Sequence, residues 1–396
     1  MSAPGHLGEL TRLVPFEMVD AVLAAAVGVQ RRVRLLPSRV VVYLLLAGGL
    51  FEHLGWGQVW ARLTASLPGE QPAPAPASVT EAMRRVGPGS LKALFDLLKG
   101  GAATTARQAA RFAERLVVAI DGTQIAVAHS PANLAVFPKP SPGPNGAAGY
   151  PMLRLVAVVA CGTRSVIEAV FGTDKVGELT YAAQLAATGG LRAGMLLLAD
   201  RNFATYRFLA QVSQTGADLL IRAKTGTNAM KLPVGERLAD GSFLTRAGDV
   251  SVRVIDAQII SRAPDGTTQS GTYRLLATLT DPREAPAITL VRLYHQRWEI
   301  ETSYLEPKST ILGGRVLRAR HPAAVVQETW ALLATYQILR TAMADAVLAR
   351  PDIDPDRASF TSRRKPPATR SSAPPGSSTT PRSTSWAVSA PPSWRP

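Results

Sequence analysis

The chain has 396 residues, of which 46% are hydrophobic, and its formal net charge is +15 at pH 7; a chain of this length can fold as two or three domains with real cores. Its one cysteine, Cys161, excludes an intrachain disulfide and a cysteine-type zinc site, so we expect a protein of the reducing cytoplasm with no signal peptide. The basic excess suits a polyanion, with nucleic acid as the first candidate, and a generally arginine-rich chain is the alternative.

Residues 1–100 are predicted to form a helical domain. The apolar run Val40–Phe51 is too short to span a bilayer, so we expect a buried helix there, capped by Ser38, and no membrane partner. Arg84 and Arg85 precede Gly87-Pro88-Gly89, a pattern typical of a helix-turn-helix DNA reader or of a plain helical bundle. The expected helices are 15–27, 40–50, 56–67, 79–86 (capped by Ser78) and 90–98, with a Pro/Ala linker at 68–77.

Residues 101–224 alternate apolar strands with helical segments, which predicts an α/β core. A long loop is expected at 131–151, where Pro, Gly and Asn are frequent. The predicted strands are 116–120, 124–128, 152–161, 165–171, 194–199 and 218–222, and the predicted helices are 178–188 and 205–215.

Residues 225–272 change character and are predicted to form a β-rich insertion, with hairpin signals at Asp240-Gly241 and Asp265-Gly266. The core is expected to resume at 273–349 with a strand at 273–279 and helices at 287–308 and 323–348. Residues 350–396 are expected to be disordered, because nine of the 35 residues from Ser362 onward are Ser and eight are Pro.

Two of the apolar strands end in an aspartate, Asp121 and Asp200. Fully apolar strands belong in the middle of an α/β sheet, where a carboxylate at the strand end is rigidly held and close to the end of the neighbouring strand. A turn aspartate before Gly122 and a helix N-cap at Asp200 are the simpler alternatives.

The predicted helix 287–308 carries a third acid, Glu301, on a charged face. At about 100° per residue, Tyr294, Arg297, Glu301 and Lys308 share an arc about 60° wide. Three converging carboxylates suit Mg²⁺ or Mn²⁺, two such ions suit phosphoryl transfer, and the cations suit phosphates. The alternative is a solvated face with an Arg297–Glu301 pair.

Together these motifs resemble those of DDE transposases of the insertion-sequence IS-four family, over roughly residues 5–355. The motifs are Asp121-Gly-Thr, Ala199-Asp200-Arg-Asn-Phe and Tyr294-x2-Arg297-x3-Glu301-x6-Lys308. The resemblance implies a ribonuclease-H-like core with a β-rich insertion, preceded by the family's helical N-terminal domain.

The implied activity is cut-and-paste transposition of double-stranded DNA at terminal inverted repeats, in the bacterial nucleoid, by a protein that dimerises on the DNA ends. Asp121, Asp200 and Glu301 would hold the metal ions. The implied DNA contacts are Tyr294, Arg297 and Lys308 near the cleaved bond, Trp298 on a flipped base, and Arg201, Asn202, Arg84 and Arg85 elsewhere.

Two features depart from the family pattern. Pro307 precedes Lys308 and, inside a helix, clashes with the carbonyl of Ser303, which would turn Lys308 off the shared face. The tail from Ser362 resembles the product of a reading-frame change. The alternatives are therefore an inactive or repurposed DNA-binding remnant and a metal-dependent nuclease on the same core. A carboxylate-pair glycosidase is disfavoured by the 6% aromatic content.

Overall fold

The computed structural model describes residues 7–27, 32, 34–69, 71–101, 111–140, 149–262, 268–294, 316–348 and 386–389. The chain divides into two compact units, and one boundary between them falls within strand β2 (Arg115–Ala126). The first unit comprises Met1–Ala110, Gly122–Glu178 and Glu301–Pro366, and the second comprises Arg111–Asp121, Leu179–Ile300 and Pro367–Pro396.

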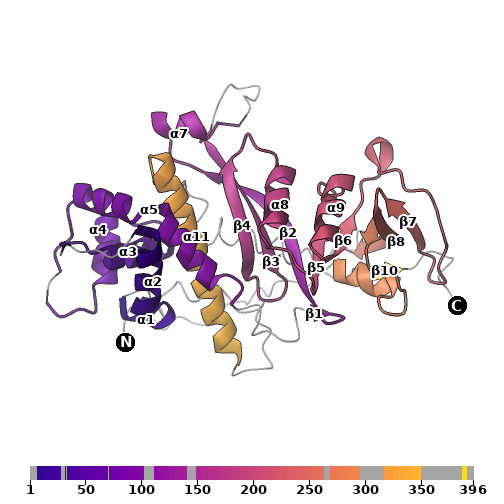
Figure 1. Cartoon of the computed structure of the whole chain (residues 1–396), viewed down its shortest axis with the longest axis horizontal. Coiled ribbons are helices and arrows are strands. Elements are labelled where there is room, and N and C mark those ends of the chain that lie inside the picture. The colour runs from indigo at the N-terminus through magenta and orange to yellow at the C-terminus, as the bar shows by residue number, and fades with distance from the viewer. Residues whose placement is uncertain are drawn as a thin grey trace, which may run out of the picture. The chain divides into compact units, whose positions relative to one another are not determined.

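The first unit is mainly helical, as expected for residues 1–100 (Figure 1). Its helices are α1 (Leu7–Leu13), α2 (Phe16–Val27), α3 (Ser38–Leu50), α4 (Trp56–Leu63), α5 (Pro76–Leu98), α7 (Pro131–Val136) and α11 (Pro322–Leu348). The apolar run in α3 is buried, because Val41 to Ala47 are at most 4% exposed. The described part of the chain contains no helix long and apolar enough to cross a membrane.

Three helix boundaries differ from the sequence prediction. Ser38 is the first residue of α3 rather than its cap, which is Pro37. Helix α5 begins at Pro76 instead of after Ser78, since proline is well tolerated in the first helical turn. The expected break at Gly87 is a kink within α5, where Gly87 has φ 68° and ψ 170°.

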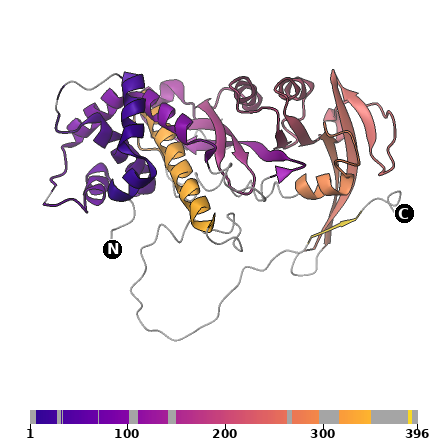
Figure 2. The same ribbon diagram turned by 60° about the horizontal axis from the view of Figure 1, so that its bottom comes forward.

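Helix α11 packs against α3 and α5 inside the first unit (Figure 2). Gln327 of α11 donates from Nε2 to the carbonyls of Met83 and Gly87, each at 2.9 Å. These bonds satisfy carbonyls near the kink in α5, where the helical bonding pattern is interrupted. The ring of Trp330 lies 5.2 Å from that of Phe95, so α11 is also held by aromatic packing.

The first unit also contains the antiparallel pair β3 (Met152–Ala160) and β4 (Val166–Thr173). Both strands were predicted. The prediction of a loop at 131–151 was wrong at its start, where Pro131–Val136 forms α7. Ser130 caps this helix by accepting from the Asn133 amide at 3.1 Å, and Pro131 follows at its first position.

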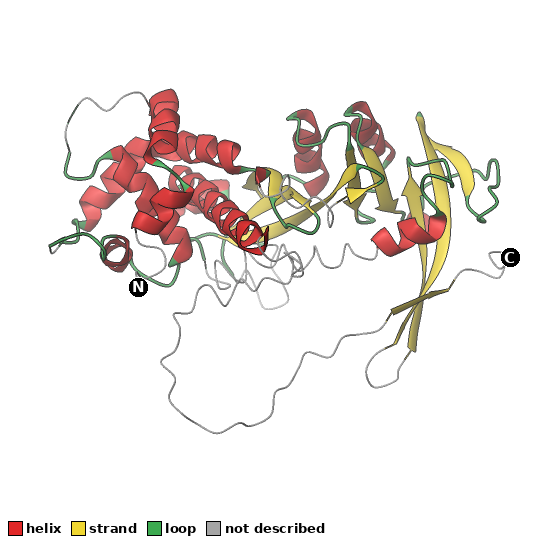
Figure 3. Cartoon of the chain, turned by 90° about the horizontal axis from the view of Figure 1, so that it is seen from below, coloured by secondary structure: helices red, strands yellow, loops and turns green. Residues whose placement is uncertain are grey.

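The second unit contains a mixed sheet (Figure 3). Its strands are β1 (Arg111–Phe112), β2 (Arg115–Ala126), β5 (Met195–Ala199), β6 (Asp218–Arg222), β7 (Phe243–Ala247), β8 (Val250–Arg262), β9 (Thr268–Ala277) and β10 (Trp386–Ser389). Strands β2 and β5 are parallel, as are β5 and β6, while β9 is antiparallel to both β6 and β8. The helices are α8 (Glu178–Ala187), α9 (Tyr206–Gln214) and the 3₁₀ turn η1 (Gly226–Asn228), with a further helical stretch at 287–294.

Every residue of β5 is buried, as the apolar sequence predicted for a central strand. Strand β2 does not stop at Ile120 but runs through the Asp-Gly-Thr motif to Ala126. Strands β7 and β8 form an antiparallel hairpin within the predicted β-rich insertion. Strand β8 pairs in turn with β9, which begins inside the predicted insertion and continues into the strand expected at 273–279. The mixed α/β fold with a helical N-terminal region is thus confirmed.

The domain boundaries predicted from sequence stay predictions, because the two compact units cut the chain differently. In the tail, Trp386–Ser389 form strand β10 against β8, which differs from the expected lack of regular structure at these residues. The rest of the tail lies outside the described residues.

Candidate active site

Asp121, within β2, and Asp200, directly after β5, occupy matching positions relative to the pairing of these two parallel strands. In the ladder between β2 and β5, Ala119 pairs with Leu198, and each aspartate follows two residues later. Adjacent strands are about 4.8 Å apart, and residues at the same register point to the same face. The register therefore places Asp121 and Asp200 side by side just beyond the last β2–β5 pair, at the carboxyl end of β5, and α/β sheets commonly bind ligands at this end of their parallel strands.

The turn after β5 fixes the carboxylate of Asp200. Its Oδ1 accepts from the backbone amide of Asn202 at 2.8 Å, and its backbone carbonyl accepts from the backbone amide of Phe203 at 3.2 Å. Phe203 is fully buried and anchors the turn. The N-cap of α9 is Thr205, so the simpler interpretation of Asp200 as a helix cap is wrong. Arg201 and Asn202 are exposed. Their contacts with DNA stay predictions.

Tyr294 lies against the same strand end. Its side chain is 4% exposed, and its hydroxyl donates to the carbonyl of Ala199, the residue before Asp200, at 3.1 Å. The described contact of Tyr294 thus fixes helix 287–294 on β5. Its predicted contact with a DNA phosphate stays a prediction.

Arg222 belongs to the same row of residues and was missed by sequence reasoning. Ala199 pairs with Ile221 on β6, so the next position places Arg222 beside Asp200. Its guanidinium lies over the ring of Tyr273, with Cζ 3.9 Å from the centroid. Only the strand register could have identified Arg222, because a basic residue at the end of a strand is common.

Glu178 lies against the residue that follows Asp121. A side-chain carbon added to Gly122 would meet the Oε1 of Glu178 at 2.1 Å. The glycine of the Asp-Gly-Thr motif therefore leaves room for this carboxylate. In the sequence Glu178 is an acid in the first turn of a helix, a position that the helix dipole favours without any further role.

The acids that the structure describes do not form a complete metal site. Among the described residues there is no group of three His, Cys, Asp or Glu side chains placed to hold a metal ion. Asp121 and Asp200 supply hard oxygen donors of the kind that Mg²⁺ and Mn²⁺ prefer. The predicted third ligand, Glu301, lies outside the described residues, as do Arg297, Trp298, Pro307 and Lys308.

The two predicted DNA-binding arginines of the helical region have different surroundings. Arg84 is exposed, pairs with Glu81 at 3.0 Å and lines a cavity of about 560 Å³ together with Arg320 and His321. Arg85 donates to the Leu36 carbonyl at 2.7 Å, and burial lowers the pKa of its guanidinium. Arg85 thus holds α5 to the chain before α3, while Arg84 is the more accessible of the two.

Comparison with known proteins agrees with these motifs. Residues 4–96 match the family described as insertion element 4 transposase N-terminal, and residues 113–338 match the transposase DDE domain. Transposase InsG for insertion sequence element IS4 of Escherichia coli (strain K12) is 27% identical over 336 residues, which cover 83% of this chain and 74% of that protein.

Among solved structures, a piggyBac transposase synaptic complex with hairpin DNA matches 88% of this chain and 75% of its own, at 9% identity and a TM-score of 0.43. The DDE-domain match spans more than half of the chain. The chain therefore belongs to the DDE transposases of the insertion element 4 family, which are metal-dependent enzymes of DNA strand cleavage and strand transfer.

Proposed function

We propose that this transposase cuts double-stranded DNA at the terminal inverted repeats of its insertion sequence and joins the freed ends to a target. Asp121, Asp200 and Glu301 are the proposed ligands of two Mg²⁺ or Mn²⁺ ions. The observation that carries the proposal is the register of β2 and β5, which supports a shared site for the first two acids. Since the described residues supply no third acid there, Glu301 is the candidate for it.

The reaction needs an attacking oxygen, a stabilised phosphate and a leaving oxygen. When bound, the metal ions would activate the attacking water and offset the charge that develops on the phosphate. Attack of water on phosphorus breaks the bond to the 3′ oxygen and leaves a 3′-hydroxyl. That hydroxyl then attacks the phosphorus of a second phosphodiester, in the other strand or in the target, and the 3′ oxygen of that bond leaves as a new 3′-hydroxyl. Asp200 is suited to bind a metal ion without reorganisation, because the backbone amide of Asn202 fixes the orientation of its carboxylate.

Basic side chains around the acids would hold the DNA strand. Arg222 lies in register with Asp200, and stacking on Tyr273 orients its guanidinium. Arg297 and Lys308 are further proposed phosphate contacts, Trp298 is proposed to brace a flipped base, and Arg201, Asn202, Arg84 and Arg85 are proposed outer contacts. We propose that the protein acts in the bacterial nucleoid and as a dimer on paired ends.

Metal removal gives the direct test of this function. Purified protein is incubated with a plasmid carrying the DNA that flanks its gene on both sides. We expect nicks at the element ends with Mg²⁺ or Mn²⁺ and none after chelation or with Ca²⁺ alone, because Ca²⁺ prefers longer bonds and more ligands. A strand-transfer assay with a second plasmid separates a transposase from a nuclease. Binding of the ends without any cleavage would contradict the proposal and favour the DNA-binding remnant.

Arg222→Ala should lower the affinity for DNA by a similar factor whatever the DNA sequence. Loss of one phosphate contact lowers the slope of log affinity against log salt by about one. The measurement is a salt titration of binding by fluorescence anisotropy, with Arg222→Lys retaining most of the slope. Arg246→Ala is the matched control, because Arg246 is an exposed arginine whose Nη2 donates to the Asp249 carbonyl in its own hairpin. An unchanged slope for Arg222→Ala would show that this arginine does not reach DNA.

A further inference from the structure

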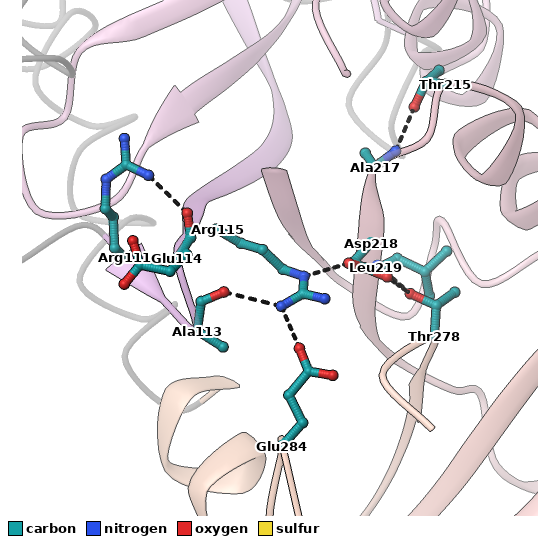
Figure 4. Close-up of polar contacts among 10 residues, drawn as sticks. All are labelled: Arg111, Ala113, Glu114, Arg115, Thr215, Ala217, Asp218, Leu219, Thr278 and Glu284. Carbon is teal, nitrogen blue, oxygen red and sulfur yellow. Dashed lines mark hydrogen bonds and ion pairs between the residues drawn. The ribbon is translucent and has the colours of Figure 1, made fainter. Parts of the chain in front are cut away.

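The turn before helix 287–294 is bonded to residues at the amino ends of the parallel strands β2 and β6. Arg115, the first residue of β2, donates from Nη1 to Glu284 of this turn at 2.6 Å. The same guanidinium donates from Nε to Asp218, the first residue of β6, at 2.5 Å, and Asp218 accepts from Thr278 at 2.7 Å. Figure 4 shows Arg115 reaching between Asp218 and Glu284. One arginine therefore ties the turn to two parallel strands.

A second arginine holds the same turn from the β-rich insertion. Arg253 of β8 is fully buried. It donates from Nη1 to the carbonyl of Ala285 at 2.6 Å and from Nε to the hydroxyl of Ser242 at 2.8 Å, and its Nη2 pairs with Asp240. The last residues before the helix are thus bonded to a buried side chain near the start of β8.

Asp240 connects this pair to the helix itself. One carboxylate oxygen accepts from the amide and the hydroxyl of Ser242, at 3.2 and 2.5 Å. The other accepts from the amide of Ala287 at 3.3 Å. Ala287 is the first helical residue, so its amide belongs to the groups that a helix leaves without an internal acceptor. Asp240 places a negative charge at the positive end of the helix.

The charge on Asp240 is maintained by its surroundings. Burial alone would raise the pKa of the carboxyl group. Hydrogen bonds from Ser242 and the positive charge of Arg253 outweigh burial and leave the pKa below its ordinary value. The carboxylate thus stays ionised at neutral pH, as its position at the helix start requires.

Helix 287–294 is consequently held at both ends. Asp240 and Arg253 fix its start, and Tyr294 fixes its last described turn on the Ala199 carbonyl beside Asp200. Leu290 and Val291 are buried between these points. An eight-residue helix is roughly 12 Å long, so a shift at its start is carried to the end that faces the acids.

We propose that Asp240 and Arg253, here called the insertion clamp, are positioning residues that set where helix 287–294 lies along the sheet and hence where the chain segment that carries Glu301 begins. The inference rests on the proposed role of Glu301. A need for stability alone does not explain the clamp, because apolar residues of similar volume often replace a buried ion pair without loss. The hydrogen bonds of Arg253 to the turn and of Asp240 to the helix start have preferred directions, so they fix the position of the helix. The β-rich insertion thereby acquires a role in assembling the active site.

The double variant Asp240→Leu/Arg253→Met tests the clamp without leaving an unpaired buried charge. We expect amide hydrogen exchange in 287–294 to become at least roughly tenfold faster, while exchange in α9 stays unchanged. In the plasmid cleavage assay, the Mg²⁺ concentration for half-maximal rate should rise roughly 10- to 100-fold, the usual loss when groups that orient metal ligands are removed. DNA affinity should stay the same.

Two further variants support the comparison. Arg246→Met removes an exposed arginine from the neighbouring strand β7 and should leave both measurements unchanged. Asp240→Asn/Arg253→Met leaves no unpaired buried charge and keeps a side-chain oxygen that can accept from the Ala287 amide, so it should retain most of the protection of the helix. A double variant with wild-type exchange and Mg²⁺ requirement would overturn the proposal. Faster exchange throughout the protein, with slower cleavage at an unchanged Mg²⁺ requirement, would also overturn it, since it would indicate a general loss of folding.

Hydrogen exchange also separates this inference from the proposed function. If the wild-type protein cleaves no DNA, the proposed function fails. Faster exchange confined to 287–294 in the double variant would then still support the clamp, and unchanged exchange there would still refute it.

Discussion

Asp121→Asn and Asp200→Asn should each abolish DNA cleavage while leaving DNA binding intact. Each change removes a negative oxygen donor, from within β2 or from directly after β5, but keeps nearly the same volume and a carbonyl oxygen. We expect a fall of at least roughly 10³-fold in the single-turnover rate, or about 4 kcal/mol of transition-state stabilisation, because the lost group is a proposed direct ligand. Affinity for DNA should be unchanged or higher, since a negative charge near phosphates is removed.

The matched control is Asp249→Asn, which removes a carboxylate from the exposed turn between β7 and β8. It should cleave DNA at the wild-type rate. Gel-shift measurements and thermal unfolding of all three variants establish binding and folding. Cleavage by Asp200→Asn within tenfold of wild type would show that the pair of acids on β2 and β5 is not the reaction centre.

The sequence predicts the parallel part of the sheet well because its strands are short and fully apolar. Met195–Ala199 and Asp218–Arg222 form strands as expected, and both are central in the sheet, where the apolar pattern carries most information. Helix boundaries were harder to predict, because Ser38 and Ser78 can serve equally well as caps or as first-turn residues. The structure uses Pro37 and Pro76 at those starts instead.

The residues of the candidate site also differ in how well the sequence predicts them. Asp121 and Asp200 could be identified because each follows an apolar strand. Arg222 could not, because its place beside Asp200 depends on the register between β5 and β6. Asp240 looked like a hairpin residue, and its bond to Ala287 joins positions 47 residues apart. Contacts of this kind depend on tertiary packing, which no local sequence pattern encodes.

Glu301→Gln should abolish cleavage as completely as the aspartate variants. Tyr294 faces the end of β5, since its hydroxyl donates to the Ala199 carbonyl. Glu301 is seven residues further on, or about two helical turns, so a helix continuing to Lys308 would direct it to the same face as Tyr294. We expect at least roughly a 10³-fold loss in single-turnover cleavage, with binding of the element ends retained.

Glu299→Gln is the matched control for this prediction. Two residues before Glu301, it lies about 200° away around a helix and so faces the opposite side. It should cleave DNA within about threefold of wild type, less than 1 kcal/mol in the barrier. Equal losses in both variants would indicate a general effect of charge on this segment. Full activity of Glu301→Gln beside inactive Asp121→Asn would require a different third carboxylate, and Glu178, which lies against Gly122, would be the next one to replace.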